Sequence, residues 1–244
     1  MQQTILNEKL LSLVVDRYAG LESEIARHQA RFQLKSLVRA IANASADAGK
    51  RIIDLAGAGL LLVALSPVLL LIAILIKLDS RGPVFFKQLR VGKWGKRFTM
   101  YKFRSMTYDA ERLKEELIKQ NEVPGGVLFK MKHDPRVTRV GRFVRRSSLD
   151  ELPQLWNVLR GEMSLVGPRP PVPAEVDTYS LSERRRLDAK PGITCTWQVS
   201  GRSQVPFRQQ VDMDVAYIES QSVWGDLKLL LRTVPAVLIG RGAY

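Results

Sequence analysis

The chain has 244 residues and a net charge of +14, from 38 Lys and Arg against 24 Asp and Glu. Its 45% apolar content is enough to bury a core, which excludes a wholly disordered chain. One cysteine and two histidines exclude a disulfide framework and a Cys/His zinc site, and they favour a reducing compartment. The surplus positive charge calls for an anionic partner, such as phosphates, nucleic acid or an acidic membrane surface.

Residues 1–47 predict an N-terminal amphipathic helical segment without a chemical motif. Apolar side chains recur there at helical spacing, at Leu6, Leu10, Leu13, Val14 and Tyr18. A secretory signal peptide is not expected, because the apolar block of the chain starts about fifty residues in.

Residues 48–80 predict a re-entrant membrane helix. They contain 22 consecutive uncharged residues, 55–76, which as one straight helix would extend about 33 Å, roughly the hydrocarbon thickness of a bilayer. Ser66-Pro67 interrupts this run at its centre, where a proline kinks a helix. Basic residues flank both ends, so both ends favour the cytoplasmic face. A helix-break-helix satisfies both facts; a straight span and a buried helix are the alternatives.

Residues 81–244 predict a single α+β domain that is mainly helical. Two β-rich stretches, PVFFKQLRVG and KRFTMYKFRSM, are separated by Lys93-Trp94-Gly95, which predicts a short hairpin. Helices are expected over 109–122, over 207–224 and over the apolar stretch 226–240, the last one broken at Pro235. The two C-terminal helices are candidates for the headgroup layer of a membrane.

The stretch between Arg136 and Pro171 contains most of the candidate chemistry. Arginines recur at every third position and could bind phosphate from one side of a helix, although a solvated basic face explains the same spacing: Arg136, Arg139, Arg142 and Arg145. Gly167-Pro168-Arg169-Pro170-Pro171 holds Arg169 on a stiff backbone, which suits either an anionic ligand or a rigid linker.

The segment from Ser148 to Glu151 has two compatible interpretations. Ser-x-x-Glu before an apolar run is typical of a capping box, followed here by a buried stripe of Leu152, Leu155, Trp156 and Leu159. The functional interpretation makes Asp150 a nucleophile or a magnesium ligand, with a pKa lowered by surrounding cations and N–H donors. Further on, turn signals at 190–194 and 200–202 bracket a β-like stretch, 195–199.

Taken together, these stretches resemble one family. The order KRIIDLAGAGLLLVALSP, YKFRSM, SLDELPQL with GPRP, and KPGITCTWQVSGR is similar to the bacterial sugar transferases, the monotopic polyprenyl-phosphate hexose-1-phosphate transferases. The resemblance covers about residues 48–244. Cys195 departs from the glycine that many relatives have after KPGIT. Because the chain has no multi-span N-terminal extension, we expect a minimal catalytic unit with its own N-terminal segment.

The resemblance implies that a sugar 1-phosphate moves from a UDP-hexose to undecaprenyl phosphate, releases UMP and primes a surface glycan. By the same resemblance, Asp150 is the nucleophile, Glu151 is its catalytic partner, and Mg²⁺ is held by Asp150 and the diphosphate. The basic residues expected at the substrate phosphates are Lys102, Arg145, Arg169 and Arg202. The hairpin at Ser66 and Pro67 would seat this site at the depth of the lipid phosphate, with Lys50, Arg51 and Lys77 near the headgroups.

The location implied is the bacterial inner membrane, with the catalytic domain on the cytoplasmic face. The C-terminal sequence resembles exopolysaccharide-type members, which favours glucose or galactose over an acetamido sugar, and a homodimer is compatible with the resemblance. A membrane-tethered binding protein without catalysis is a rival, if the Asp-Glu pair only caps a helix. A nucleic-acid binder is the second rival, motivated by the net charge, although the sequence has no helix-turn-helix, zinc-finger or aromatic-platform signature.

Overall fold

A computed structural model describes residues 47–117, 131, 134–201 and 204–239, together with scattered residues between 25 and 45. The chain divides into two compact units, 1–49 and 50–244. The described residues of the first unit are helical. The apolar spacing from Leu6 to Tyr18 lies outside the described residues.

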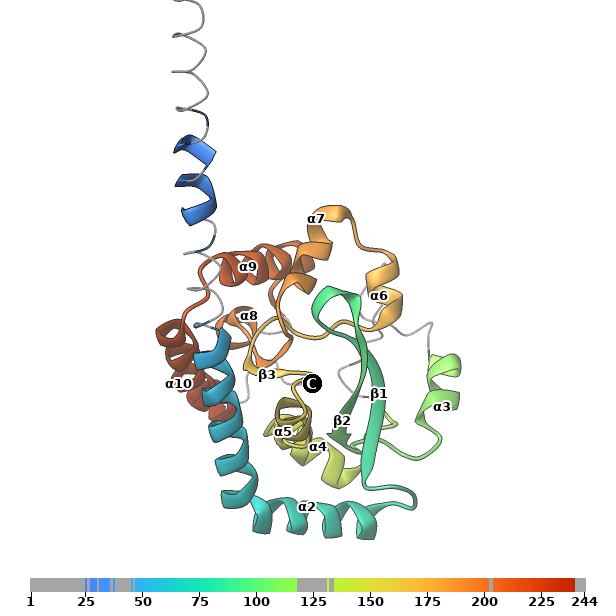
Figure 1. The fold of residues 1–244 in the computed structure, drawn as a ribbon. Helices are drawn as coiled ribbons and strands as arrows, with labels where there is room; N and C mark the ends of the chain where they lie inside the picture. Colours follow the sequence, from blue (N-terminus) through green and yellow to red (C-terminus); the bar gives the residue numbers. More distant parts are fainter. Residues whose placement is uncertain are drawn as a thin grey trace, which may run out of the picture. The chain divides into compact units, whose positions relative to one another are not determined.

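The second unit is mainly helical and contains two small sheets (Figure 1). β1 (Phe85–Val91) and β2 (Arg97–Phe103) form an antiparallel hairpin around the short 3-10 turn η1 (Lys93–Gly95), as predicted. β3 (Ser164–Val166) and β4 (Gly192–Thr194) pair in parallel. The helical segments, in chain order, are Asp47–Ala64, α2 (Ser66–Asp79), α3 (Ala110–Leu117), α4 (Arg139–Arg146), η3 (Leu149–Glu151), α5 (Gln154–Leu159), α6 (Pro173–Asp177), α7 (Leu181–Arg184), η4 (Arg185–Asp188), α8 (Thr196–Ser200), α9 (Phe207–Glu219) and α10 (Val223–Ile239).

The apolar run forms two helices, which confirms the predicted break. Asp47–Ala64 and α2 are bent by 61° relative to each other. Pro67 lies in the first turn of α2, where its missing N–H is not needed, and Ser66 Oγ donates to the Val63 carbonyl oxygen over 2.8 Å. Within the described part of the chain no single helix has the length and hydropathy of a membrane span, but this bent pair has them jointly. The shape is consistent with a re-entrant helix.

The helix α2 has two apolar faces. One face packs Ile72 and Ile76 against Phe103 and Val144, so it is part of the protein core. The other face is exposed along its length, at Val68, Leu70, Leu71, Ile74 and Leu78. α10 likewise exposes Trp224, Leu231 and Val234. Contiguous exposed apolar surface of this kind marks a site of interaction with a membrane or a protein.

The main core joins the β1–β2 hairpin to α5, β3, α9 and α10, around Met100, Leu155, Val158 and Met163. Asn157, which is fully buried, fastens α5 to β2: its side-chain amide donates to the Thr99 carbonyl oxygen over 2.7 Å and its Oδ1 accepts from the Tyr101 backbone N–H over 3.1 Å. This docking brings the end of β2 close to η3.

Three expectations about local structure were wrong. Trp156 is 52% exposed, because the buried face of α5 is built by Leu155 and Val158 and position 156 lies about 100° away from position 155 on a helix. α10 continues through Pro235 to Ile239, since a proline can kink a helix without ending it. The stretch 195–199 is not a strand: α8 starts at Thr196, directly behind the buried Cys195.

Candidate active site

The Asp150-Glu151 pair lies in η3, the short turn that connects α4 to α5. Ser148, just before it, has a left-handed backbone (φ 55°), and its side chain makes no capping hydrogen bond. The predicted capping box is therefore not formed. Glu151 instead accepts a hydrogen bond from Lys102 Nζ over 2.7 Å, and Arg169 Nη1 lies 3.7 Å from the same carboxylate oxygen. Left-handed backbone at a residue other than glycine is costly and is concentrated at functional sites.

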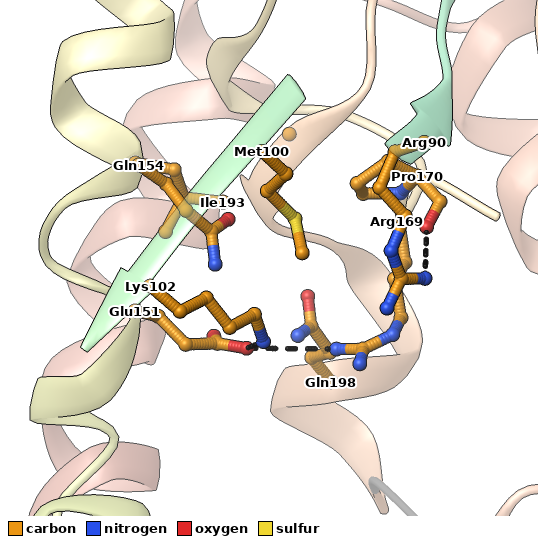
Figure 2. A pocket seen from close by; sticks show the side chains of 10 residues that line it. Arg90, Met100, Lys102, Glu151, Gln154, Arg169, Pro170, Ile193 and Gln198 are labelled. Atoms are coloured by element: carbon orange, nitrogen blue, oxygen red, sulfur yellow. Dashed lines mark hydrogen bonds and ion pairs between the residues drawn. The ribbon is translucent and has the colours of Figure 1, made fainter. Parts of the chain in front are cut away.

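Four separate elements bring cations to this pair. Lys102 comes from β2, Arg145 from α4, Arg169 from the loop after β3, and Arg90 from β1. Arg90 is buried and donates to the Pro170 carbonyl oxygen over 2.8 Å, which fixes the loop that carries Arg169 (Figure 2). Arg145 Nε donates to Ser105 Oγ over 2.9 Å. The three basic residues 102, 145 and 169 predicted from the sequence thus lie around the predicted carboxylates.

The two carboxylates have opposite pKa shifts. Burial opposes the ionisation of Glu151, but the charges of Lys102 and Arg169 prevail and hold its pKa well below the usual range. Burial raises the pKa of Asp150, and the charge of Glu151 raises it further, against the attraction of Lys102 and Arg145. The lowered pKa expected for Asp150 is therefore wrong, because a neighbouring carboxylate and burial outweigh the cations. Paired acids with divergent pKa values are typical of catalytic sites.

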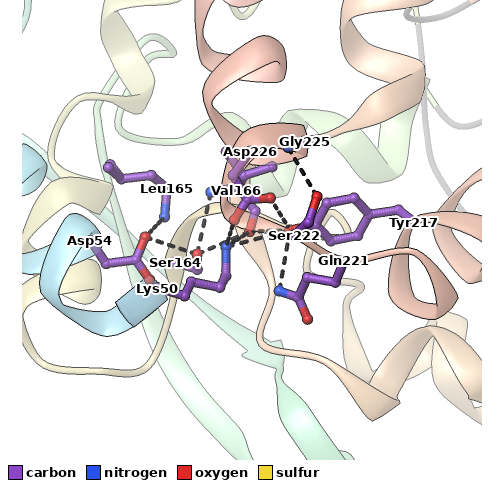
Figure 3. A network of polar contacts seen from close by, with 10 residues as sticks. All are labelled: Lys50, Asp54, Ser164, Leu165, Val166, Tyr217, Gln221, Ser222, Gly225 and Asp226. Carbon is purple, nitrogen blue, oxygen red and sulfur yellow. Dashed lines mark hydrogen bonds and ion pairs between the residues drawn. The ribbon is translucent and has the colours of Figure 1, made fainter. Parts of the chain in front are cut away.

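A buried polar network holds the strand that leads to Arg169 (Figure 3). Asp54 Oδ1, on the first apolar helix, accepts from the Leu165 N–H over 2.9 Å and from Ser164 Oγ over 3.0 Å. Lys50 Nζ donates to the Val166 carbonyl oxygen over 2.9 Å and forms an ion pair with Asp226 of α10. Arg169 follows Val166 by three residues, so this network fixes the start of the loop that carries Arg169.

The loop after β3 also approaches the start of β4 very closely. A Cβ added to Gly192 would lie 2.1 Å from the backbone nitrogen of Gly167, so both positions require glycine. The Gly192 N–H donates to the Pro168 carbonyl oxygen over 2.9 Å and the Gly167 N–H donates to Thr194 over 3.0 Å. The turn signals in GPRPP and KPGIT thus build one rigid double loop beneath Arg169.

The row of arginines does not form one phosphate-binding face. Arg136 is buried and its guanidinium pairs with Asp134 over 2.6 Å. Arg139 and Arg142 are exposed on α4, and only Arg145 turns toward the site. Spacing by three spreads side chains around a helix whose turn takes 3.6 residues. Arg202 lies outside the described residues.

Two of the three predicted headgroup residues have partners inside the protein. Lys50 belongs to the buried network above, and the two terminal nitrogens of Arg51 donate to the carbonyl oxygens of Val158 and Leu159 over 2.6 and 2.9 Å. These two cations bind carbonyl oxygens at the end of α5 and in β3. Their hydrogen-bond donors therefore have partners without lipid phosphates. Lys77 Nζ donates to the Gly82 carbonyl oxygen over 3.0 Å at an exposed position near the end of α2.

A small pocket opens between Glu151 and Arg169. Its further lining includes residues that the sequence analysis did not select as site residues: Arg90, Met100, Gln154, Ile193 and Gln198. Their only signal in the sequence was proximity to the motifs: Gln154 stands three residues after Glu151, and Gln198 lies in TWQVSGR. Asp150 itself does not line this pocket.

The donor set fits a magnesium ion that is shared with a substrate. In residues 47–117 and 134–239, apart from the undescribed 202–203, no group of three or more His, Cys, Asp or Glu could hold a metal ion alone. Mg²⁺, however, is usually held by one or two carboxylates together with substrate phosphates. Glu151 is engaged by Lys102 and Arg169, whereas the ion pairs of the site leave Asp150 without such a partner among the described residues. Asp150 is thus the carboxylate that a cation could use.

Comparison with known proteins identifies the family. Residues 45–240 match the model of the bacterial sugar transferase family, and the chain belongs to it. It is 46% identical over 195 residues to the galactosyl transferase CpsE of Streptococcus agalactiae, covering 80% of this chain and 43% of that protein. It is 43% identical over 206 residues to the UDP-glucose:undecaprenyl-phosphate glucose-1-phosphate transferase of Caulobacter vibrioides, covering 81% and 73%.

The exopolysaccharide production protein ExoY of Sinorhizobium fredii is 41% identical over 198 residues, covering 80% of this chain and 88% of that protein. The chain thus spans less than half of the length of CpsE but most of the length of ExoY.

Proposed function

We propose that the protein is a membrane-associated phosphoglycosyl transferase that moves a hexose 1-phosphate from a UDP-hexose to undecaprenyl phosphate and so primes exopolysaccharide synthesis. The main support for this proposal is the geometry of the site. Two adjacent carboxylates have opposite pKa shifts and are surrounded by cations from four elements. The printed activity of the Caulobacter relative, with UDP-glucose and undecaprenyl phosphate as substrates, supports this reaction. Phosphoryl transfer depends mainly on positioning and charge neutralisation, which such a site supplies.

The proposed reaction has two steps. A carboxylate oxygen of Asp150 attacks the phosphorus that bears the hexose, the bond from that phosphorus to the bridging oxygen breaks, and UMP leaves. A phosphate oxygen of undecaprenyl phosphate then attacks the same phosphorus, the bond to Asp150 breaks, and the carboxylate is regenerated as undecaprenyl diphosphohexose departs. Splitting the transfer in this way lets a soluble donor and a lipid acceptor react one after the other.

The basic residues have distinct tasks in this proposal. Lys102 and Arg169 keep Glu151 ionised and lie where they can neutralise phosphate oxygens of the donor. Arg145, half-buried near Asp150, draws the carboxyl toward its charged, nucleophilic form. Asp150 and the donor diphosphate would hold a magnesium ion, which when bound supplies additional neutralisation of phosphate charge.

In this proposal the bent helix pair, Asp47–Ala64 and α2, inserts into the membrane, and α10 lies in the headgroup layer. The outward face of α2 and the exposed apolar face of α10 would be the lipid-facing surfaces. We propose that both ends of the pair lie on the cytoplasmic face of the inner membrane. A cysteine replacing Gln2, in a Cys195→Ser background, should then react with a membrane-impermeant thiol reagent only after cells are permeabilised. Reaction in intact cells would establish a straight span.

The chemistry is tested by Asp150→Asn, which preserves shape but removes charge and nucleophilicity. We expect purified Asp150→Asn to release no UMP from UDP-glucose or UDP-galactose and to form no covalent adduct by mass spectrometry, while the wild type does both. Asp212→Asn, at an exposed position on α9, is the matched control and should behave as the wild type. Substantial UMP release by Asp150→Asn would remove Asp150 from the role of nucleophile.

A further inference from the structure

The pocket between Glu151 and Arg169 contains two carboxamides whose side chains make no hydrogen bond to the described residues. Gln154 is 3% exposed, yet no hydrogen bond of its side chain is found among the described residues. Oε1 of Gln198 is buried and accepts no hydrogen bond from the part of the chain that the structure describes. Buried polar groups in folded proteins are almost always satisfied, and an exception points to a bound molecule. Both amides line the same pocket, one from α5 and one from α8 (Figure 2).

The rest of the lining explains what kind of group would satisfy them. Lys102 and Arg169 contact Glu151 at one side of the pocket, where the proposed function places the donor phosphates, and Arg90 donates to the Pro170 carbonyl oxygen. Met100, Pro170 and Ile193 add apolar surface. A neutral group with hydroxyls for the amides and C–H faces for the apolar side chains matches this combination, and a sugar ring has both. An amide supplies donors and an acceptor to such hydroxyls.

We propose that Gln154 and Gln198 form the subsite for the hexose of the donor and contribute to the choice among hexoses. This inference rests on the proposed function, because the position of the hexose follows from the phosphorus that Asp150 would attack. The hexose is attached directly to that phosphorus, whereas the uracil is separated from it by a second phosphate and a ribose. The group that can reach a pocket lined by Glu151 is therefore the hexose.

The test replaces each amide by a side chain of similar volume that cannot form hydrogen bonds. Gln154→Met and Gln198→Met should fold, because neither side-chain amide makes a hydrogen bond to the described residues that the substitution would remove. Gln210→Met on α9 is the matched control, since its amide donates to Val205 outside the pocket. Melting temperatures of all three variants establish that each one is folded.

The readout is the dissociation constant, measured in an Asp150→Asn background so that no turnover is needed. The probes are UDP-glucose, UDP-galactose and UMP, which lacks the hexose. Either pocket substitution should weaken binding of the preferred UDP-hexose about 10-fold, leave UMP binding within a factor of about two, and change the ratio between the two UDP-hexoses. Gln210→Met should change none of these quantities.

Two results would overturn the inference. An equal loss of affinity for UMP and the UDP-hexoses would place the uridine in this pocket, and unchanged affinity for all three would mean that the amides meet only water. Failure of the proposed function looks different: the protein with Asp150 intact would bind UDP-hexoses yet release no UMP, and the binding comparison would still decide what Gln154 and Gln198 contact.

Discussion

Two clusters of charged side chains in this protein are built from the same residue types and are completed differently. In the network of Figure 3, Lys50 is matched by Asp226, and Asp54 accepts two hydrogen bonds from the strand β3. In the site of Figure 2, Glu151 faces Lys102 and Arg169 at once, and Oε1 of Gln198 is buried without a partner among the described residues. Burial and the charge of Glu151 oppose the ionisation of the adjacent Asp150. The first cluster, whose charges and hydrogen bonds are complete, holds the fold, whereas the second, left incomplete, is the one we propose to bind a ligand.

The largest expected effect is the loss of stability when the closed network is broken. Asp226→Leu leaves the largely but not fully buried Lys50 without its ion-pair partner, which costs about 3–5 kcal/mol and should lower the melting temperature by about 10 °C. Lys50→Met combined with Asp226→Leu removes both charges and should recover most of that loss. Differential scanning fluorimetry in detergent gives both values. If the double variant is as unstable as the single one, the pair is not a self-contained unit.

The next effect concerns the open site, where geometry should matter more than charge. Arg169→Lys keeps the positive charge but loses the planar fork, and we expect kcat/KM for UMP release to fall about 100-fold. The melting temperature should change little, because Arg169 is partly exposed and its contact to Glu151 is long. Turnover close to that of the wild type would show that Arg169 does not bind the substrate and that its segment is only a rigid linker.

A smaller effect is expected from pH. Asp150 attacks as a carboxylate, so activity should be lost as the pH falls through its pKa, which burial and Glu151 raise to about 6. The rate of UMP release should therefore rise between about pH 5 and pH 7 and then level off. Glu151→Gln removes the neighbouring negative charge, so the residual activity of that variant should have its acidic limb at lower pH. If the acidic limb of the pH–rate profile of Glu151→Gln lies at the same pH as that of the wild type, the charge of Glu151 does not influence the pKa of Asp150.

The smallest effect has the opposite sign to that in the closed network. Because the folded protein raises the pKa of Asp150, ionisation of this group costs stability above that pKa and costs nothing below the pKa of the unfolded chain. With magnesium chelated, Asp150→Asn should raise the melting temperature by a few degrees at pH 8 and hardly at pH 4. A lower melting temperature at pH 8 would mean that the carboxylate is a structural group like Asp226.

Local signals in the sequence determined several features correctly. The apolar run breaks at Ser66-Pro67 as expected, and Lys93-Trp94-Gly95 between the β-rich stretches forms the turn of the hairpin. The family motifs predict that Lys102, Arg145 and Arg169 lie near Asp150 and Glu151, and the structure places them there. These features depend on backbone chemistry or on short motifs, which act over a few residues.

Tertiary structure decided what each charge does. Spacing along the chain made Arg136 and Arg145 equivalent, but one pairs with Asp134 in the interior and the other faces the site. The sequence predicted that Lys50 lies near lipid headgroups, but in the structure it pairs with Asp226, which is 176 positions away. Likewise the pKa of Asp150 is raised and not lowered, because burial and the charge of Glu151 outweigh the attraction of Lys102 and Arg145. The function of a charged side chain depends on long-range neighbours and desolvation, and neither is encoded in local sequence.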